Sequence, residues 1–489
     1  MKRIVYLDLV EQYANYLYSY ISIFNFYNIT MSSYADQTVA SLKLAATLAE
    51  SYLQQIHQRH VAPTAKSLIE LQALDCELPD KPTTPFDTLT LLDRAGSPAT
   101  VATTGGRFFG LVVGGALPAT VGSRVLNAAW DQLATTQDTS PVALQLERTV
   151  SRWLLDLLRL PTHASVGYVT GTTMGNFTCL AAARHQQLKK LGWDVEQQGL
   201  FGAPPIRVIA SEEIHVTVTK VLSLLGLGKQ NVLAIETDSN GAIRPDKLPE
   251  LGPDCIILTQ AGNVNSGAID PVGEIANRAQ AADAWVHVDG AFGLWARVNP
   301  DLDSMTQGIE LADSWVTDAH KWLNTPYDCG VAICRHSTAI HAAMSTVAPY
   351  FSFDSQVAPK DMVPELSRSA RAMDVWAALH SLGREGVRNL IQDCCRHAQM
   401  AAQSLRSMGF DIVNEVVLNQ VVVSHATDQH RLAELAEIVK RSGEAWFGVT
   451  HWKQRDAFRL SFSSWATTDQ DVTRLLKAIE LAARQLGLK

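Results

Sequence analysis

The sequence predicts an α/β protein, with a seven-stranded, mostly parallel sheet followed by a smaller α+β domain. Two observations support this prediction. From Pro141 onward, short runs of branched apolar residues alternate with helical patterns, and such alternation is typical of parallel sheets with helices on both faces. Several polar residues that packing does not readily explain come directly after these runs. In α/β proteins this edge of the sheet, at the carboxyl ends of the strands, is where ligands bind.

Seven runs have the composition and length of buried strands. They lie at residues 165–170, 206–211, 231–237, 255–262, 284–290, 314–320 and 329–335. Helical periodicity separates several of these runs, at residues 174–191, 216–225 and 272–282. Gly192 and Gly226 end the first two of these predicted helices.

The segments before this core have a different pattern. Residues 41–74 show apolar spacing of three and four residues, which predicts helices. Pro79, Pro82 and Pro85 then indicate a linker. Residues 96–122 are dense in glycine, which fits either close packing of two backbones or a loop that lines a pocket.

After Pro364 the pattern predicts a second, smaller domain. Helices are expected at residues 365–382, 388–408, 432–440 and 469–486, and strands at 411–417, 420–424 and 458–463. The chain is therefore divided into an extension of doubtful function (1–30), a helical segment with the pocket loop (31–140), a large α/β domain (141–364) and a small α+β domain (365–489).

Composition limits the class of protein. Of the 489 residues, 47% are apolar and 18% are charged, as in ordinary globular proteins. The net charge of −8 provides no basic field for nucleic acid. Seven cysteines without a C-x-x-C pair favour neither a disulfide framework nor a zinc site, which indicates a reducing compartment, the cytoplasm. Residues 16–29 are too short and too polar to span a membrane.

Two of the strand-like runs end in residues suited to one kind of chemistry. Lys321 follows His320 at the end of one run, and Asp289 ends the run before it. An enzyme built on pyridoxal phosphate (PLP) needs such a pair, because the lysine forms the Schiff base and the carboxylate partners the pyridinium nitrogen. Taken alone, a lysine is usually a solvated charge, and an aspartate at a strand end equally caps a turn.

Two further positions fit the same chemistry. Residues 170–176, TGTTMGN, lead into a helix, whose start is suited to a phosphate, although small hydroxyl residues there also serve as N-caps. His215 follows another strand-like run, where an imidazole either stacks on a flat cofactor or simply packs. His57 and His60 lie one helical turn apart without a third ligand, so no metal is predicted.

The order of these motifs resembles the PLP-dependent group II amino-acid decarboxylases, the family of aromatic-amino-acid, glutamate and histidine decarboxylases. The matching motifs are VTGTTMGNF, EEIH, HVDGAFG, DAHKWLN, PELSRSAR and FRLSFSSW, and the resemblance extends from Phe86 to the C-terminus. It implies the aspartate-aminotransferase type of fold (fold type I), PLP as the cofactor, an L-amino acid as the substrate and a homodimer with active sites at the subunit interface.

The resemblance also implies roles for individual residues. Lys321 would be the Schiff-base lysine, Asp289 the pyridinium partner and His215 the ring-stacking histidine. The other expected cofactor contacts are Ala291 near the ring, Gly171, Thr172 and Thr173 in a phosphate cradle, and Asp318 and His320 beside the lysine.

One departure from the family leaves the proton donor open. Many of these decarboxylases carry a tyrosine on a loop after the lysine, which protonates the carbon that CO2 has left. Residues 351–363 contain no tyrosine, although Tyr350 stands just before them and Tyr327 stands just after Lys321. The expected donor is His215 or Tyr350.

The sequence thus predicts decarboxylation of an L-amino acid through an external aldimine. Phe108 and Phe109, in the glycine-rich segment, favour an aromatic or apolar substrate. Two alternatives stay open at this point. One is an aminotransferase or another lyase, with Arg368, Arg371 or Arg459 anchoring the substrate carboxylate; the other is a PLP-binding homologue without turnover.

Overall fold

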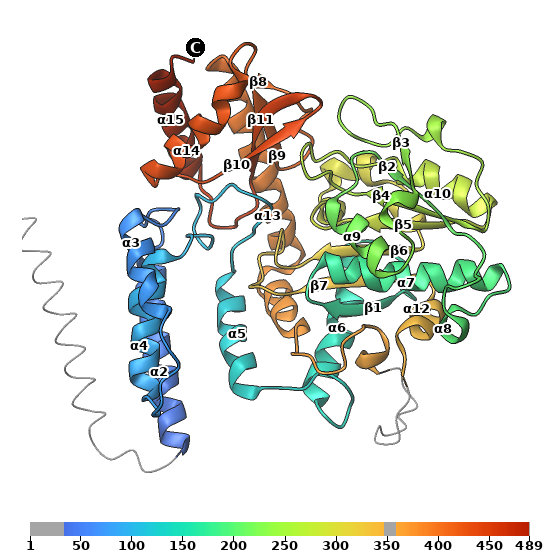
Figure 1. Cartoon of the computed structure of the whole chain (residues 1–489), viewed down its shortest axis with the longest axis horizontal. Helices are drawn as coiled ribbons and strands as arrows, with labels where there is room; N and C mark the ends of the chain where they lie inside the picture. The colour runs from blue at the N-terminus through green and yellow to red at the C-terminus, as the bar shows by residue number, and fades with distance from the viewer. Residues whose placement is uncertain (1–33, 347–357, 489) are drawn as a thin grey trace, which may run out of the picture. The chain divides into compact units, whose positions relative to one another are not determined.

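The computed structural model describes residues 34–346 and 358–488, which form two compact units (Figure 1). The first unit comprises the described residues up to Arg59 together with Pro63–Val101. Its helices are α2 (Tyr34–Gln55), α3 (Ala65–Glu70) and α4 (Pro85–Gly96), with short 3-10 turns at Leu71–Leu74 and Ser97–Ala99. The predicted extension at residues 1–30 lies outside the described residues.

The start of α4 corrects the prediction of a linker through Pro85. Thr84 caps this helix, because its hydroxyl oxygen accepts the N–H of Asp87 at 3.0 Å. Pro85 occupies the first helical position, where a missing N–H costs nothing and the fixed φ favours the helix. Here the third proline begins a helix, although a cluster of prolines usually indicates a loop.

The second unit contains a seven-stranded sheet in the order β1-β7-β6-β5-β4-β2-β3. Only β7 runs antiparallel to its neighbours β1 and β6, so the predicted mostly parallel sheet is confirmed. Each strand lies within the range predicted for it: β1 (Ser165–Val169), β2 (Arg207–Ser211), β3 (Val232–Ile235), β4 (Cys255–Gln260), β5 (Trp285–Asp289), β6 (Ser314–Asp318) and β7 (Gly330–Cys334).

Helices cover both faces of this sheet. Neighbouring residues of each buried strand point to opposite sides, so both faces carry apolar side chains that the helices cover. Val208 and Ala210 pack against α7 (Thr172–Lys190), α9 (Val216–Leu224) and α12 (Ser337–Met344) on one face. Ile209 packs into the core on the other face, which α6 (Pro141–Leu157), α10 (Val272–Ala281) and α13 (Ala372–Ser407) close. This unit also contains the helices α5 (Pro118–Trp130), α8 (Val195–Gln198) and α11 (Asp303–Thr306).

A four-stranded antiparallel sheet follows, in the order β10-β11-β9-β8. Its strands are β8 (Asp411–Ile412), β9 (Gln420–Ser424), β10 (Gly448–Trp452) and β11 (Arg455–Ser461), and α14 (Leu432–Ser442) and α15 (Asp469–Leu486) pack on it. The strand β10 was not predicted. Its first four residues alternate between partly exposed and exposed positions at the edge of the sheet, and only its last residue, Trp452, is buried, so the strand lacks an apolar run.

The helix predicted at residues 365–382 begins later than expected, at Ala372. The carbonyl oxygens of Leu366 and Arg368 accept hydrogen bonds from Thr135 and Ala134, so this backbone bonds to another segment and not to its own helix. Gly383, with φ of 62°, interrupts α13 where the sequence predicted a break between two helices.

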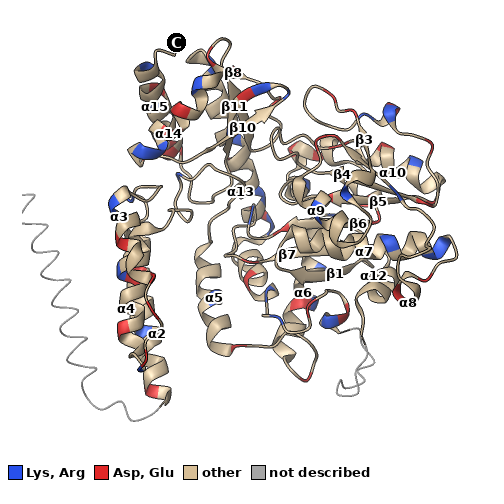
Figure 2. Ribbon diagram, in the orientation of Figure 1, with Lys and Arg blue, Asp and Glu red and all other residues tan. Residues whose placement is uncertain are grey.

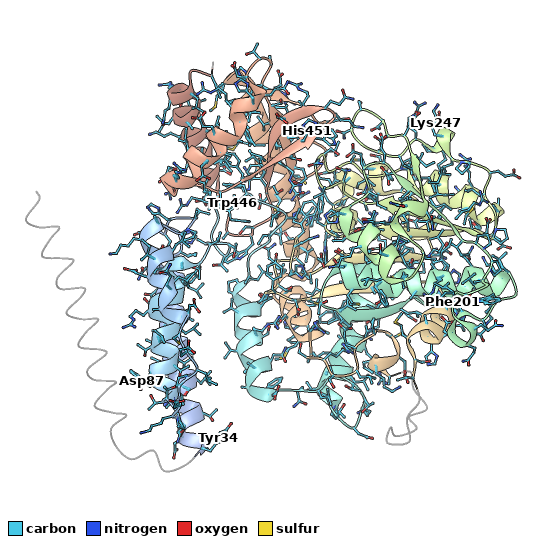
Figure 3. The ribbon with its side chains drawn as sticks, viewed as in Figure 1. Tyr34, Asp87, Phe201, Lys247, Trp446 and His451 are labelled. Atoms are coloured by element: carbon cyan, nitrogen blue, oxygen red, sulfur yellow. The ribbon has the colours of Figure 1, made fainter. Side chains whose placement is uncertain are left out.

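Charged residues of both signs are intermixed over the surface of the ribbon (Figure 2). In the part of the chain that the structure describes, no helix is both long and apolar enough to cross a membrane. Trp446, labelled in Figure 3, stacks on Phe108 with 4.8 Å between ring centroids. This contact ties the glycine-rich segment to the small sheet.

A buried ion pair joins α6 to the segment before α13, and its loss is expected to destabilise the fold. Arg368 contacts Glu147 at 2.8 Å, with side chains 1% and 8% exposed. Arg368→Met would leave the glutamate buried without a partner and lower the free energy of unfolding by about 3 kcal/mol. Thermal or urea unfolding measures this cost.

The double variant Arg368→Met/Glu147→Met should recover most of the loss, because it removes both buried charges. Arg484→Met is the control, since Arg484 pairs with Glu480 in solvent and should cost less than about 1 kcal/mol. A cost for Arg368→Met no larger than this control would contradict the assignment.

Candidate active site

Four strands deliver the predicted polar residues to one edge of the large sheet. The loop after β1 carries Gly171 into α7, and the loop after β2 carries His215 into α9. Asp289 is the last residue of β5, and Asp318 is the last residue of β6. Because β1, β2, β5 and β6 run in the same direction, their carboxyl ends meet at the same edge.

Lys321 lies in the turn after β6, where its Nζ is 3.0 Å from Oδ2 of Asp318. Its side chain is only 22% exposed, so the usual explanation of a lysine as a solvated charge does not apply. Asp318 is 2% exposed and supplies the compensating charge.

Distant segments hold this turn in place. Asn324, with φ of 58°, donates from Nδ2 to the carbonyl oxygens of Trp322 and Ser463, at 3.0 Å each. A Cβ atom at Gly114 would lie 1.7 Å from the carbonyl oxygen of Lys321. The glycine-rich segment therefore packs its backbone directly against the lysine turn, and only glycine fits there.

Asp318 also binds the start of α7. Its Oδ1 accepts the backbone N–H of Thr172 at 2.7 Å, and its Oδ2 accepts the hydroxyl of Thr172 at 2.9 Å. Both donors of Thr172 are thus in use, although the sequence predicted this residue as part of a phosphate cradle. Within the described residues, the N–H groups of Thr173 and Met174 have no backbone partner, as is usual in the first turn of a helix.

His320 is buried beside this carboxylate. Its Nδ1 accepts the N–H of Cys329 at 3.1 Å, and its Nε2 is 3.6 Å from Oδ1 of Asp318. Burial lowers the pKa of His320, with the Asp318 charge acting in the opposite direction. The ring of Tyr327 lies against it, with 4.5 Å between centroids.

Asp289 is a buried carboxylate that hydrogen bonds alone satisfy. Asn176 donates from Nδ2 to its Oδ2, and the N–H of Ala291 donates to its Oδ1, each at 3.1 Å. In the described part of the chain no lysine, arginine or histidine forms an ion pair with it, although its exposure is 8%. A buried carboxylate is stable only with a compensating partner.

His215 caps α9 and lies within electrostatic range of the other site residues. Its Nδ1 accepts from Thr217, whose hydroxyl oxygen is 2.7 Å away and whose backbone nitrogen is 3.4 Å away. The neutral ring therefore carries its proton on Nε2. Burial lowers the pKa of His215, Asp289 raises it, and Lys321 and Arg459 lower it further.

These residues fit PLP. The uncompensated carboxylate of Asp289 is suited to a protonated pyridine nitrogen, and the free N–H groups at the start of α7 are suited to a phosphate. Lys321 and His215 have the functional groups for covalent attachment and for ring stacking. The set of donors thus agrees with the cofactor that the sequence predicted.

The three arginines proposed from the sequence have different environments. Arg368 pairs with Glu147, and Arg371 pairs with Asp328 at 3.1 Å. Arg459 instead donates to the carbonyl oxygens of Val264 at 2.6 Å and Leu111 at 3.5 Å, and among the described residues it has no carboxylate partner. Burial lowers its pKa to about 10.

Phe108 and Phe109 do not line the site, contrary to expectation. Phe109 is fully buried against Phe462, at 5.1 Å between centroids, and Phe108 is 7% exposed beneath Trp446. Both rings pack against the small domain, so they give no information about the substrate. Tyr350, a predicted proton donor, lies outside the described residues.

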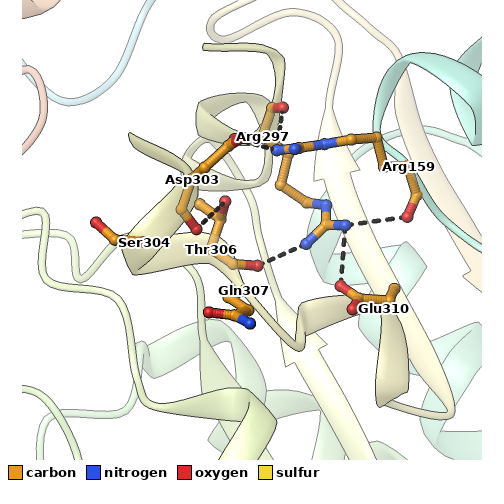
Figure 4. Close-up of a pocket in the computed structure, with 7 residues that line it drawn as sticks. All are labelled: Arg159, Arg297, Asp303, Ser304, Thr306, Gln307 and Glu310. Atoms are coloured by element: carbon orange, nitrogen blue, oxygen red, sulfur yellow. Dashed lines mark hydrogen bonds and ion pairs between the residues drawn. The ribbon is translucent and has the colours of Figure 1, made fainter. Parts of the chain in front are cut away.

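A pocket of about 500 Å³ lies at the opposite end of β6 (Figure 4). Residues 303–310, which line part of it, precede that strand, whereas the site residues follow it. Arg297 donates to the carbonyl oxygens of Leu158, Arg159 and Thr306 and pairs with Glu310 at 3.0 Å. The hydrogen-bond donors of Arg297 are satisfied by protein atoms. We therefore interpret this pocket as a place where segments of the fold pack together and not as a ligand-binding site.

Comparison with known proteins identifies the family. Residues 90–425 match the model of the pyridoxal-dependent decarboxylase conserved domain. The chain is 27% identical to an aromatic-L-amino-acid decarboxylase of Bacillus atrophaeus, over 71% of this chain and 74% of that one. It is 27% identical to a 4-hydroxyphenylacetaldehyde synthase of Rhodiola rosea (72% and 75% covered) and 29% identical to an L-2,4-diaminobutyrate decarboxylase of Rhizobium meliloti (76% of each).

A solved structure confirms the fold. The structure of Oryza sativa TDC with PLP and tryptamine superposes with a TM-score of 0.86, at 22% identity, over 94% of this chain and 99% of that one. Since the family model covers most of the chain and the site has the donors that the cofactor needs, the protein belongs to the pyridoxal-dependent decarboxylases, enzymes that use PLP to remove the carboxylate of an amino acid.

Proposed function

We propose that the protein decarboxylates an aromatic L-amino acid to the corresponding amine, with Lys321 and Asp289 as the two residues that make PLP reactive. The observation that supports this proposal most directly is the pair of charges at the strand ends: a partly buried lysine that pairs with Asp318, and the buried carboxylate of Asp289, which has no cation partner among the described residues. The aromatic class is proposed because relatives such as the Bacillus enzyme are named for it.

Each residue has a definite task. Lys321 would hold PLP through its amine, and Asp289 would keep the ring nitrogen protonated. His215 would stack on the ring, with Ala291 beside it, and Gly171 and Thr173 would hold the phosphate at the start of α7. Asp318 and His320 lie beside the lysine and would orient its amine. Bound PLP supplies an electron sink for the electron pair left behind when the carboxylate departs as CO2.

The first test is a panel of L-amino acids given to the PLP-loaded protein. We expect CO2 and amine in equal amounts from an aromatic amino acid, and no product with Lys321→Ala, which has no amine to bond PLP. Borohydride should fix PLP to the wild-type chain but not to this variant.

The panel separates the alternatives by product. Keto acid without CO2 would indicate an aminotransferase, and aldehyde with CO2 would indicate the activity for which the Rhodiola relative is named. Turnover of 2,4-diaminobutyrate in preference to aromatic amino acids would overturn the proposed substrate class. PLP bound without any product would indicate a non-catalytic homologue.

We assign the substrate carboxylate to Arg459 in either reaction, because an aminotransferase would keep the carboxylate there and a decarboxylase would use the same contact to hold the bond between Cα and the carboxylate perpendicular to the PLP ring. This guanidinium is partly buried, acts electrostatically on His215 and has no carboxylate partner among the described residues. Arg459→Met should raise KM for the amino acid about 10- to 100-fold, the loss of one charge-assisted hydrogen bond. Steady-state kinetics of amine formation measures this change.

Arg455→Met is the matched control, because Arg455 lies on the same strand and pairs with Asp411 instead. It should leave KM unchanged, and both variants should bind PLP as the wild type does. An unchanged KM in Arg459→Met would remove this assignment.

We propose Tyr350 as the proton donor to the carbon that CO2 has left. The sequence suggests His215 or Tyr350 for this step, and Tyr327 has the same phenol group. In the proposed arrangement the His215 ring stacks face-on against the cofactor, which directs its N–H along the ring plane and not at the reacting carbon, and the ring of Tyr327 lies against His320. Burial and the Asp318 charge raise the pKa of Tyr327.

Tyr350→Phe should lower the rate of amine formation about 100-fold or more, the usual worth of a general acid, while PLP binding stays normal. Tyr327→Phe retains Tyr350 and should keep most of the rate. A loss confined to Tyr327→Phe would transfer the role to that residue, and wild-type rates in both variants would transfer it to His215.

We further propose that the enzyme is a homodimer built on α5. This helix buries the polar residues Thr120, Ser123 and Asn127 and exposes Val125, Leu126 and Trp130 at 45–47%. An apolar face that points outward while polar residues point inward is typical of a subunit interface. The resemblance to the group II decarboxylases, which implies a homodimer, supports a second copy of this chain as the occupant.

Trp130→Glu should shift the protein from dimer to monomer in analytical ultracentrifugation, because a charge at the centre of an apolar interface is costly. Leu481→Glu is the control, since Leu481 is 57% exposed on α15. If the wild type sediments as a monomer, this interface does not form.

Two further expectations, on the cellular compartment and on the domain boundaries, are part of this proposal. All seven cysteines are free, which agrees with a reducing compartment such as the cytoplasm. The proposed arrangement has residues 141–364 as the cofactor-binding domain and residues 365–489 as the small domain.

A further inference from the structure

A line of buried polar groups extends from Asp289 away from the cofactor site. Along β5 the side chains of Trp285, His287 and Asp289 share one face of the sheet, because strand residues alternate. That face packs against α7, whose first turns carry Asn176. The strand register places Ser314 of β6 beside His287.

Four hydrogen bonds connect these residues in series. Nε1 of Trp285 lies 3.0 Å from Oγ of Ser314, and Oγ of Ser314 lies 2.8 Å from Nδ1 of His287. Nε2 of His287 lies 2.7 Å from Oδ1 of Asn176. Nδ2 of Asn176 then donates to Oδ2 of Asp289 at 3.1 Å.

Chemistry fixes the direction of every bond in this series. The indole N–H of Trp285 only donates, and an ionised Asp289 only accepts. Asn176 must therefore present its NH2 group to Asp289 and its carbonyl oxygen to His287. The Nε2 atom of His287 then carries the proton, and its Nδ1 accepts the hydroxyl hydrogen of Ser314.

A neutral imidazole is the only form that satisfies both neighbours, since it has one N–H and one lone pair. His287 is 1% exposed, and burial lowers its pKa to about 3. The ring is thus neutral throughout the physiological range. This histidine acts as a fixed connector and does not take up a proton.

The helix reaches the strand because Gly175 has no side chain. A Cβ atom at this position would lie 3.0 Å from Cγ1 of Val316, on the strand next to β5. Close approach of the two backbones brings the short amide of Asn176 within reach of both His287 and Asp289. An amide free to rotate would direct its oxygen at the carboxylate half of the time, which is repulsive.

We infer that Trp285, Ser314, His287 and Asn176 form a one-way relay that locks the Asn176 amide and so holds Asp289 ionised and oriented for the pyridine nitrogen of PLP. His287 and Asn176 are positioning residues, because they act on the cofactor only through Asp289. This inference rests on the proposed role of Asp289. It adds the hydrogen-bonded residues that set the strength of the contact between Asp289 and the ring nitrogen of PLP.

The test compares PLP affinity among variants of the full-length apoenzyme, measured by quenching of protein fluorescence. His287→Leu and Asn176→Asp break the relay, and each should raise the dissociation constant of PLP about 10-fold or more. Asn176→Asp removes the hydrogen bond to the Asp289 carboxylate, and His287→Leu leaves the Asn176 amide free to turn away from it. Asn176→Asp also places a second carboxylate against Asp289 without changing the volume of the side chain.

Conservative variants distinguish positioning from packing. His287→Gln keeps an N–H near the position of Nε2 and should recover most of the affinity that His287→Leu loses. Trp285→Phe keeps an aromatic ring and removes only the last donor, so its effect should be the smallest of the series. Thr178→Val is the control, because Thr178 is buried on the same helix and bonds only to the carbonyl oxygen of Met174.

A second readout reports on the ring nitrogen itself. PLP labelled with isotopic nitrogen in the ring gives an NMR signal that depends on protonation. In the wild type the ring nitrogen should stay protonated to a higher pH than in Asn176→Asp or His287→Leu. A purely structural role would lower apoenzyme stability in these variants without moving this titration.

Wild-type affinity and an unchanged ring-nitrogen signal in both relay variants would overturn the inference. An equal loss of affinity in Thr178→Val would overturn it as well, because α7 packing alone would then explain the effect. Failure of the proposed function has a different signature, since the wild type itself would then bind no PLP or form no product.

Discussion

The burial of the Asp289 carboxylate is the interaction on which the rest of the site depends. Removal of a charge from water costs several kcal/mol unless hydrogen bonds and an opposite charge compensate for it. Asn176 and Ala291 supply the hydrogen bonds, and no cation of the described residues supplies the charge. The site is therefore complete only when a group with a protonated nitrogen occupies it, which is what a PLP enzyme requires.

The lysine turn illustrates a second constraint, because residues far apart in the sequence hold it. Asn324 bonds to Ser463 and accepts the N–H of Trp465, while Gly114 packs on the carbonyl of Lys321. Close packing of two backbones, one of the two explanations of the glycine-rich segment, is therefore observed at Gly114. The surface against which it packs is the turn that carries Lys321.

The hydrogen-bond and ion-pair partners of each arginine also determine the role open to it. Arg368 and Arg371 have carboxylates beside them, so their charges are used within the protein. Among the residues that the structure describes, Arg459 contacts carbonyl oxygens and no carboxylate, so no ion pair there compensates its charge near His215. The contrast between these three residues arises from the segments that fold against them, and their own sequence context does not show it.

The sequence by itself determined the large sheet, the polar strand ends and the family. Strands alternate with helices in a pattern set by local side-chain burial, and the carboxyl ends of parallel strands meet whatever lies between them. Lys321, Asp289 and His215 were predicted for this reason. The edge strand β10 and the helix that begins at Ala372 were missed or misplaced, because solvent exposure or distant contacts override local pattern there. The helix that begins at Pro85 was missed because its proline was taken as part of a linker and not as the first residue after the Thr84 cap.

Only the tertiary structure decided how the charges are compensated. Thr172 is bound to Asp318, Phe109 packs into the small domain, and Asn176, Ser314 and His287 align behind Asp289. The sequence contained each of these residues without indicating its partner. A hydrogen bond between residues more than a hundred positions apart depends on strand register and helix approach, which the chain acquires only when the whole sheet is assembled.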